Sequence, residues 1–251
     1  MGVSYINLVA QWEEEKADLL PIIDEVMAKG IFVGGSNVRL FEQAVENFCH
    51  VKHCVALNSG TDALMCALWA LGVKKGDEVI TPPNSFISST AAIVHLGATP
   101  VFIDVASDQN IDVAQIEKSI TSKTKVIMPV HLTGRMVDMN RIKTIATKFD
   151  LKIVEDCAQS IGSKLTNQFS GSFGDIGCFS CHPLKNLNAC GDGGFIITDN
   201  DDCAQFIREI RNHGMQDRNI VNQFGVVSRM DELQAAILLF RINKLSAVIE
   251  K

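Results

Sequence analysis

Short apolar runs alternate with longer runs of helical periodicity along most of this 251-residue chain. Such alternation is typical of a mostly parallel sheet covered by helices, because parallel strands need crossover connections and these are usually helical. The sequence therefore predicts a three-layer α/β domain. The expected strands are 53–57, 78–81, 99–105, 125–130, 151–155, 176–180 and 194–198. The expected helices are 61–71, 85–95, 113–119, 140–149 and 202–212, with an amphipathic helix around 38–48 and another over 230–251.

The composition excludes several classes of protein. With 47% hydrophobic and 21% charged residues, the chain is typical of a soluble globular protein. A net charge of -6 argues against a general nucleic-acid binder. No apolar run approaches the roughly 20 residues that span a membrane, and residues 1–16 lack a basic region followed by an apolar one. We therefore expect a cytoplasmic protein.

The eight cysteines are expected to be reduced core residues, because several lie inside apolar stretches. Cys178 and Cys181 have a redox-like spacing, but no second pair completes a metal site. The segment 49–54 contains two cysteines and two histidines, yet it joins a helix end to a strand start, where the side chains would diverge. The prediction is therefore that the chain has no metal site.

Three segments carry groups that together suit pyridoxal phosphate. Residues 58–64 follow the first strand and open a helix, so Gly60 and Thr61 can supply amides and a hydroxyl to a phosphate, although any strand-to-helix turn favours such residues. Asp156 ends an apolar strand, where its carboxylate can pair with a protonated pyridine nitrogen or simply cap a helix. Lys185 follows a later strand and can form an imine with the cofactor aldehyde.

Two further residues complete the candidate site. Phe86 begins a helix after another strand, from where its ring can cover a planar cofactor, although most such phenylalanines belong to the core. Ser180 ends the strand that precedes the loop of Lys185, and it lies close to this lysine in the sequence. An amine, a carboxylate and an anion-binding turn in this order predict a site for pyridoxal 5'-phosphate (PLP).

Six motifs resemble those of the DegT/DnrJ/EryC1/StrS family of sugar aminotransferases. They are SGTDAL (59–64), EDCAQS (155–160), FSCHPLKNL (179–187), GDGG (191–194), RNHG (211–214) and RMDELQAA (229–236). The resemblance implies a fold-type-I PLP enzyme in which Lys185 forms the imine and Asp156 pairs with the pyridine nitrogen. It also implies that Gln159 contacts the cofactor ring, that Gly60, Thr61 and Ser180 hold the phosphate, and that Phe86 stacks on the ring.

The same resemblance implies a reaction and its partners. An amino group would pass from an amino acid, expected to be L-glutamate, to a nucleotide-linked keto sugar, for surface polysaccharide or glycosylated metabolites. The resemblance further implies a homodimer with sites at the interface. A dehydratase branch has histidine at the position of Lys185, so this chain resembles the aminotransferases, although a different reaction at the sugar stays an alternative. His182, Asn186 and His213 are candidates for the substrate side.

Two departures from the family pattern bear on activity. Members usually carry an asparagine, reaching the neighbouring subunit's phosphate, where this chain has Val227, and Ser228 is the candidate replacement. The resemblance also implies a large domain over 1–228 and, over 229–251, the start of a helix leading to a small C-terminal domain that this chain lacks. A truncated, weakly active or inactive PLP-binding regulatory protein is therefore the alternative to an active enzyme.

Overall fold

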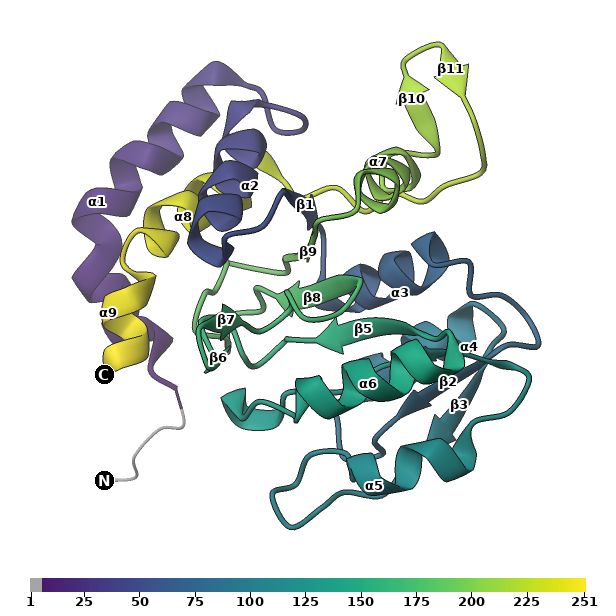
Figure 1. The fold of residues 1–251 in the computed structure, drawn as a ribbon. Helices are drawn as coiled ribbons and strands as arrows, with labels where there is room; N and C mark the ends of the chain where they lie inside the picture. The colour runs from purple at the N-terminus through teal and green to yellow at the C-terminus, as the bar shows by residue number, and fades with distance from the viewer. Residues whose placement is uncertain (1–5) are drawn as a thin grey trace.

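The computed structural model describes residues 6–251 and contains a seven-stranded sheet (Figure 1). The order across the sheet is β1-β9-β8-β5-β4-β2-β3. Strand β9 is antiparallel to both of its neighbours, whereas the remaining pairs are parallel. The strands are β1 (His53–Leu57), β2 (Glu78–Thr81), β3 (Thr99–Phe102), β4 (Thr124–Ile127), β5 (Lys152–Asp156), β8 (Ile176–Ser180) and β9 (Gly194–Thr198). The predicted mostly parallel sheet is confirmed.

Helices cover both faces of this sheet. Successive side chains of a strand point to opposite faces, so Val154 packs under one layer and Ile153 under the other. The first layer consists of α3 (Gly60–Ala70), α4 (Ile87–His95) and α7 (Asp201–Ile210). The second consists of α2 (Ser36–Cys49), α5 (Val113–Ile116), α6 (Met139–Phe149) and α8 (Glu232–Ile242). The expected three-layer α/β architecture therefore forms.

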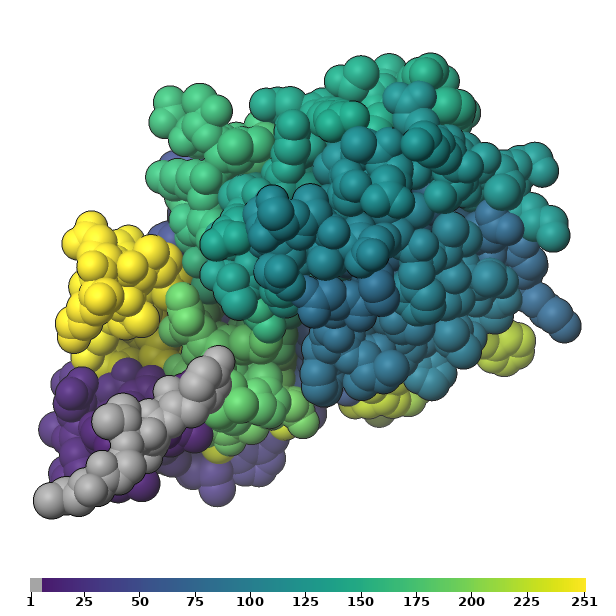
Figure 2. Space-filling model, turned by 90° about the horizontal axis from the view of Figure 1, so that it is seen from below, coloured from purple at the N-terminus to yellow at the C-terminus, as the bar shows by residue number. Residues whose placement is uncertain are grey.

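The two ends of the described chain pack together. Helix α1 (Leu8–Lys29) contacts α8, and the Arg241 guanidinium donates to the Glu15 carboxylate over 2.6 Å. Figure 2 shows the purple N-terminal and yellow C-terminal segments side by side at one end of the molecule. Helix α1 was not predicted, because only Leu19 and Val26 along its 22 residues are buried. Its apolar stripe is too narrow to reveal a helix by periodicity.

Several expected boundaries were wrong. The helix over 230–251 is divided into α8 and α9 (Leu245–Glu250), because the chain turns at Asn243 and Lys244. Strand β3 ends at residue 102 instead of 105. It is the outermost strand of the sheet, so only one neighbouring strand pairs with it. Two short hairpins, β6 (Lys164–Leu165) with β7 (Gln168–Phe169) and β10 (Met215–Asp217) with β11 (Ile220–Val221), were not expected. The 3-10 turns are Glu117–Ser119 and Leu132–Gly134.

The sheet order brings three distant strand ends to one edge. Strands β1, β8 and β5 run in the same direction and lie within four adjacent positions, so Leu57, Ser180 and Asp156 end at the same edge. Gly194 begins β9 between them, and any side chain there would overlap the backbone of Ser59 and Gly60. Glycine therefore lets the turn before α3 approach the sheet closely.

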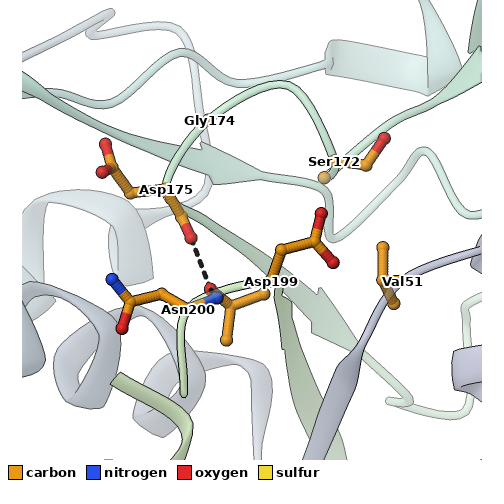
Figure 3. Close-up of a pocket in the computed structure, with 8 residues that line it drawn as sticks. Val51, Ser172, Gly174, Asp175, Asp199 and Asn200 are labelled. Atoms are coloured by element: carbon orange, nitrogen blue, oxygen red, sulfur yellow. Dashed lines mark hydrogen bonds between the residues drawn. The ribbon is translucent and has the colours of Figure 1, made fainter. Parts of the chain in front are cut away.

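The opposite edge of the sheet carries a separate hollow, which we call the turn pocket (Figure 3). Its cavity of about 300 Å³ is lined by Asp175, which precedes β8, and by Thr198 and Asp199 at the end of β9. The Thr198 hydroxyl donates to the Asp175 carbonyl oxygen over 2.7 Å, the bond dashed in Figure 3. Over residues 6–251, no helix combines the length and apolar character needed to cross a membrane.

Candidate functional site

A cavity of about 420 Å³ lies at the edge where β1, β5 and β8 end. This volume is within the usual range for small-molecule sites. All seven residues predicted for the cofactor line it, namely Gly60, Thr61, Phe86, Asp156, Gln159, Ser180 and Lys185. The fold thus brings together side chains that are separated by up to 125 positions (from 60 to 185) in the sequence. Their roles toward a cofactor stay predictions.

One end of the cavity is formed by the turn that opens α3 and by the end of β8, the residues predicted to hold the cofactor phosphate. We call this part the phosphate cradle and define it as Ser59, Gly60, Thr61 and Ser180. Ser59 caps α3 by accepting a bond from the Asp62 amide over 3.1 Å. A Cβ atom on Gly60 would lie 2.7 Å from the Ser180 Cβ, so glycine keeps this space open. The first amides of a helix have no partner within the helix, and together they attract an anion.

Asp156 forms the buried end of the cavity. Its side chain accepts hydrogen bonds from the Ser89 hydroxyl over 2.7 Å and from the Ala158 amide over 3.1 Å. Burial raises the pKa of the Asp156 carboxyl, while those two bonds and the charge of Lys185 act in the opposite direction. The charged form of a carboxylate in such a position is stabilised when a cationic ligand group binds beside it.

Lys185 lies half-buried in the same cavity. Burial lowers the pKa of its amine below the ordinary value of 10.5, and the negative charge of Asp156 partly opposes this. The loop that carries Lys185 is closed by a bond from the Lys185 amide to the His182 carbonyl oxygen. A lysine with a lowered pKa is more often neutral, which is the form that acts as nucleophile and accepts protons.

Gln159 and Phe86 lie on the more exposed sides of the cavity. The Gln159 Oε1 atom accepts a bond from the Thr133 amide over 2.7 Å, which leaves the Nε2 group as the donor available to a ligand. Thr133 adopts a left-handed conformation with φ of 54°, so this amide is held by a strained turn. The Phe86 ring is 73% exposed and lines the cavity, so it is not a core residue.

Sequence reasoning did not assign several polar residues that line this cavity. They are Ser59, Ser85, Ser88, Ser89 and Asp192. Thr61 donates to Ser88 over 2.8 Å, and this bond ties the cradle to the beginning of α4. A detectable signal was the helical spacing of residues 85, 86 and 89, which places them on one side of α4 and its N-terminal turn. Among the substrate candidates, His182 lines the cavity, whereas Asn186 and His213 do not.

A second buried polar cluster lies directly behind Asp156. The ligand atoms of His131, Glu155 and Cys157 lie within 4.8 Å of one another, which is close enough to suggest a metal site. However, His131 Nδ1 accepts from the Val137 amide and its Nε2 atom lies 2.9 Å from Glu155, so both ring nitrogens are engaged. Glu155 also accepts three backbone amides, from residues 171, 173 and 174. We interpret the cluster as a hydrogen-bond network that supports the end of β5.

The segment 49–54, with its two cysteines and two histidines, joins the end of α2 to the start of β1, and its side chains diverge. Cys49 ends α2 and Cys54 lies in β1. The His50 ring packs against Phe169, with 5.8 Å between the centroids, whereas His53 lies 2.6 Å from the Asp201 carboxylate. The two imidazoles therefore have different partners.

The position of the usual asparagine lies outside the cavity. Val227 is exposed and pairs with Asn212 in an isolated bridge. Ser228 is fully buried, and its hydroxyl donates to the Asn58 side chain over 3.1 Å. In this structure Ser228 is therefore engaged within its own chain.

The residues present fit PLP. The cradle can hold a phosphate, because it is kept open by Gly60 and faces the amides that begin α3. The buried Asp156 supplies a negative charge for a protonated ring nitrogen, and the half-buried Lys185 supplies an amine in the same cavity. These three groups match the three parts of the cofactor that need a partner.

Comparisons with known proteins agree with this geometry. A model of the DegT/DnrJ/EryC1/StrS aminotransferase family matches residues 13–251. A UDP-N-acetyl-3-dehydro-alpha-D-glucosamine 3-aminotransferase of Acidithiobacillus ferrooxidans is 42% identical over 98% of this chain and 67% of its own length. A pleiotropic regulatory protein of Geobacillus stearothermophilus is 40% identical over 100% of this chain and 68% of its own length. The chain thus spans about two thirds of the length of these relatives.

Solved structures are similar over the same range. The crystal structure of DesV from S. venezuelae, in complex with a ketimine intermediate, has a TM-score of 0.95 and 37% identity over 98% of this chain and 66% of that one. NtdA from Bacillus subtilis, with bound cofactor PMP, has a TM-score of 0.88 and 39% identity over 93% of this chain and 54% of that one. This protein belongs to the DegT/DnrJ/EryC1/StrS aminotransferase family.

Proposed function

We propose that this chain carries the PLP site of a sugar aminotransferase, which moves an amino group from an amino acid to a nucleotide-linked keto sugar. The observation that carries the proposal is one cavity that contains a buried carboxylate, a half-buried lysine and a helix N-terminus kept open by glycine. Each group alone is common, but their combination suits PLP in particular.

The residues would share the work as follows. Gly60, Thr61 and Ser180 would bind the phosphate, and Phe86 would cover the ring and exclude water from it. Asp156 would keep the ring nitrogen protonated, because a buried carboxylate favours a cation beside it. The bound cofactor supplies an electron sink for the carbon from which a proton is removed.

Lys185 would bind the cofactor covalently and later move a proton at its Nζ atom. Its lowered pKa increases the neutral fraction of the amine at physiological pH, which favours both tasks. Asp156 limits how far that pKa falls, so the same carboxylate influences both the ring and the amine.

The substrate class follows from the relatives. Those at 37–42% identity include proteins named for UDP- and dTDP-linked amino sugars. We therefore propose a nucleotide-linked keto sugar as acceptor and L-glutamate as donor, in the cytoplasm, for surface polysaccharide or glycosylated metabolites. We also propose a homodimer, in which a second copy completes the cavity.

A second candidate function is regulation without catalysis. Two relatives are named a pleiotropic regulatory protein and a sensory transduction protein, at 40% and 36% identity. The chain also spans only about two thirds of their length. A chain of this kind would bind PLP and respond to no amino donor.

Spectroscopy with PLP separates the two functions. PLP added to the purified chain should give the visible absorbance of a covalently held cofactor, and L-glutamate should bleach it with formation of 2-oxoglutarate. Keto sugars linked to UDP or dTDP should then restore the band. A band that ignores glutamate and every other amino acid would contradict the aminotransferase proposal and favour regulation. The absence of any band would contradict both.

A further inference from the structure

Helix α4 brings two residues to the cavity from one side of its first turn. Phe86 precedes the helix and Ser89 follows three residues later, and both residues line the cavity. Phe86 is 73% exposed, whereas Ser89 is 1% exposed. Ser89 therefore lies at the buried end of the cavity, beside Asp156.

Hydroxyl groups form a directed chain that ends at the Asp156 carboxylate. Ser89 donates to Asp156 Oδ2 over 2.7 Å, and the Ser89 and Ser85 hydroxyl oxygens lie 2.7 Å apart. A hydroxyl group has one proton, so while Ser89 donates to Asp156, Ser85 must be the donor to Ser89. Two protons thus point along one line toward the carboxylate.

Other charged groups face Asp156 less directly. Lys185 and His131 act on it through their charge, from the loops after β8 and β4. Glu155, Cys157 and the β8 residue Cys178 are further titratable neighbours. Within residues 6–251, the donors of hydrogen bonds to this carboxylate are the Ser89 hydroxyl and the Ala158 amide. Substitution of Ser89 removes the first donor, whereas the second is a main-chain amide that any substitution other than proline retains.

This inference rests on the function proposed above. We propose that Ser89 is a positioning residue that acts through Asp156. Ser89 holds the carboxylate in one orientation and in the charged form on which a protonated pyridine nitrogen depends, and Ser85 keeps the Ser89 proton directed at it. Bonds to a charged group are stronger than bonds between neutral groups, and burial strengthens them further.

The test measures PLP binding against pH, without any sugar substrate. In Ser89→Ala we expect the dissociation constant of PLP at neutral pH to rise about tenfold, as for loss of one bond to a buried charge. Without this bond Asp156 protonates at higher pH, so the weakening of PLP binding on acidification should begin about one pH unit higher. Ser89→Thr keeps a hydroxyl and should bind PLP within about threefold of the unchanged chain.

Two more variants keep the test decisive. Ser85→Ala should weaken PLP binding by about threefold, because it removes only the second bond of the chain. It should also shift the pH at which acidification weakens PLP binding by less than Ser89→Ala does. Thr90→Ala removes the next hydroxyl along α4, which does not line the cavity, and should change neither quantity. Circular dichroism and thermal midpoints establish that each variant is folded. If Ser89→Thr does not fold because of its extra methyl, Ser85→Ala decides.

Two results would overturn the proposal. One is a Ser89→Ala variant with the PLP affinity and pH dependence of the unchanged chain. The other is an equal loss in folded Ser89→Ala and Ser89→Thr, which would show that only packing matters. Failure of the unchanged chain to bind PLP is a different outcome, because it contradicts the proposed function itself.

Discussion

The two edges of the sheet each carry a hollow with an aspartate, yet the two aspartates are held in opposite ways. At the turn pocket, Asp175 is partly exposed, accepts the Ile153 amide and lies 3.4 Å from the Lys152 ammonium. At the candidate site, Asp156 is 4% exposed, and burial raises its pKa. The Asp175 carboxylate is already paired within the fold. The charged form of Asp156, in contrast, is disfavoured by burial, and a cationic ligand beside it would stabilise that form.

This difference shows that the volume and polarity of a cavity do not by themselves identify a functional site. The cavities measure about 300 and 420 Å³, and both contain acidic and hydroxyl groups. In the turn pocket those groups serve local structure, since Asp199 accepts the Lys52 amide and Asn200 caps α7. At the candidate site the polar groups converge on one space from several strand ends. Polar groups that converge on one cavity, with a buried charge whose pKa is shifted, indicate function more strongly than the presence of a cavity alone.

The largest expected contrast is between the two lysines. Lys185→Ala should abolish the visible absorbance of bound PLP and lower turnover with glutamate by at least about 10³-fold, because it removes both nucleophile and proton carrier. Lys152 pairs with Asp175 of the turn pocket, and Lys152→Ala should leave turnover within about twofold, since surface ion pairs contribute little. Absorbance and 2-oxoglutarate release measure both. Unchanged turnover in Lys185→Ala would remove the basis of the assignment.

The second contrast exchanges each aspartate for asparagine. Asp156→Asn should weaken PLP binding by about 100-fold, as for loss of a buried charge partner. Asp175→Asn keeps a carbonyl acceptor for the Ile153 amide, so neither PLP affinity nor stability should change appreciably. Equal losses of PLP affinity in the two variants would end the distinction between the edges.

The same Asp156→Asn variant has a predicted pH dependence of stability without PLP. The folded pKa of Asp156 is raised above its ordinary value of 3.8, so ionisation is harder in the folded chain than in the unfolded one. The stability of the unchanged chain should therefore decline as pH rises through that raised pKa, and the variant should escape this decline. Thermal midpoints measured in a series that starts near pH 3.8, the ordinary pKa, and rises to about pH 8 follow this decline. A variant that loses stability relative to the unchanged chain as pH rises would contradict the sign.

The third contrast adds one methyl group at each edge. Gly60→Ala would place its Cβ 2.7 Å from the Ser180 Cβ and narrow the cradle, so PLP affinity should fall about tenfold, the equivalent of modest overpacking. Gly174→Ala would place its Cβ 2.7 Å from Ile153 Cγ2, and should lower the free energy of unfolding by about 1–3 kcal/mol without changing PLP affinity. Titration calorimetry and denaturant unfolding separate these effects. A cradle variant that loses only stability would argue against phosphate binding there.

The smallest contrast replaces one hydroxyl at each edge. Thr61→Val should weaken PLP binding by about threefold to tenfold, because it removes a candidate phosphate contact and the bond to Ser88. Thr198→Val loses its bond to the Asp175 carbonyl and should cost about 1 kcal/mol of stability, with PLP affinity unchanged. A Thr61→Val variant that binds PLP normally would restrict the cradle to its backbone amides.

Strands and helices were predicted correctly from the sequence where a local pattern of apolar and turn residues marks them. Strands 53–57, 78–81, 176–180 and 194–198 were placed to the residue, because buried strands are short apolar runs bounded by turn residues. Helix α1 was missed because most of its surface is exposed and its partner α8 lies some 200 residues away. The break between α8 and α9 was missed for a related reason, since apolar spacing continues across it.

Candidate site residues were found where the residue type itself carries the chemistry. Asp156, Lys185 and Gly60 follow strands, so their clustering was expected once a parallel sheet was predicted. Ser89 and Thr133 were not found, because a serine inside a helix and a backbone amide in a loop have no chemical signature of their own. Their importance depends on the atoms they face, Asp156 Oδ2 and Gln159 Oε1.

The sequence by itself determined the chemical groups, the alternation of strands and helices, and the family, because these depend on residue type and order. Only the tertiary structure decided how each carboxylate is held: Asp156 is buried and accepts a bond from Ser89, whereas Asp175 is partly exposed and pairs with groups of its own turn and strand. Asp156 and Asp175 both lie next to an apolar strand in the sequence, and strand direction then separates them to opposite edges. Desolvation and charge pairing depend on neighbours in space, which the sheet order brings together across more than a hundred residues.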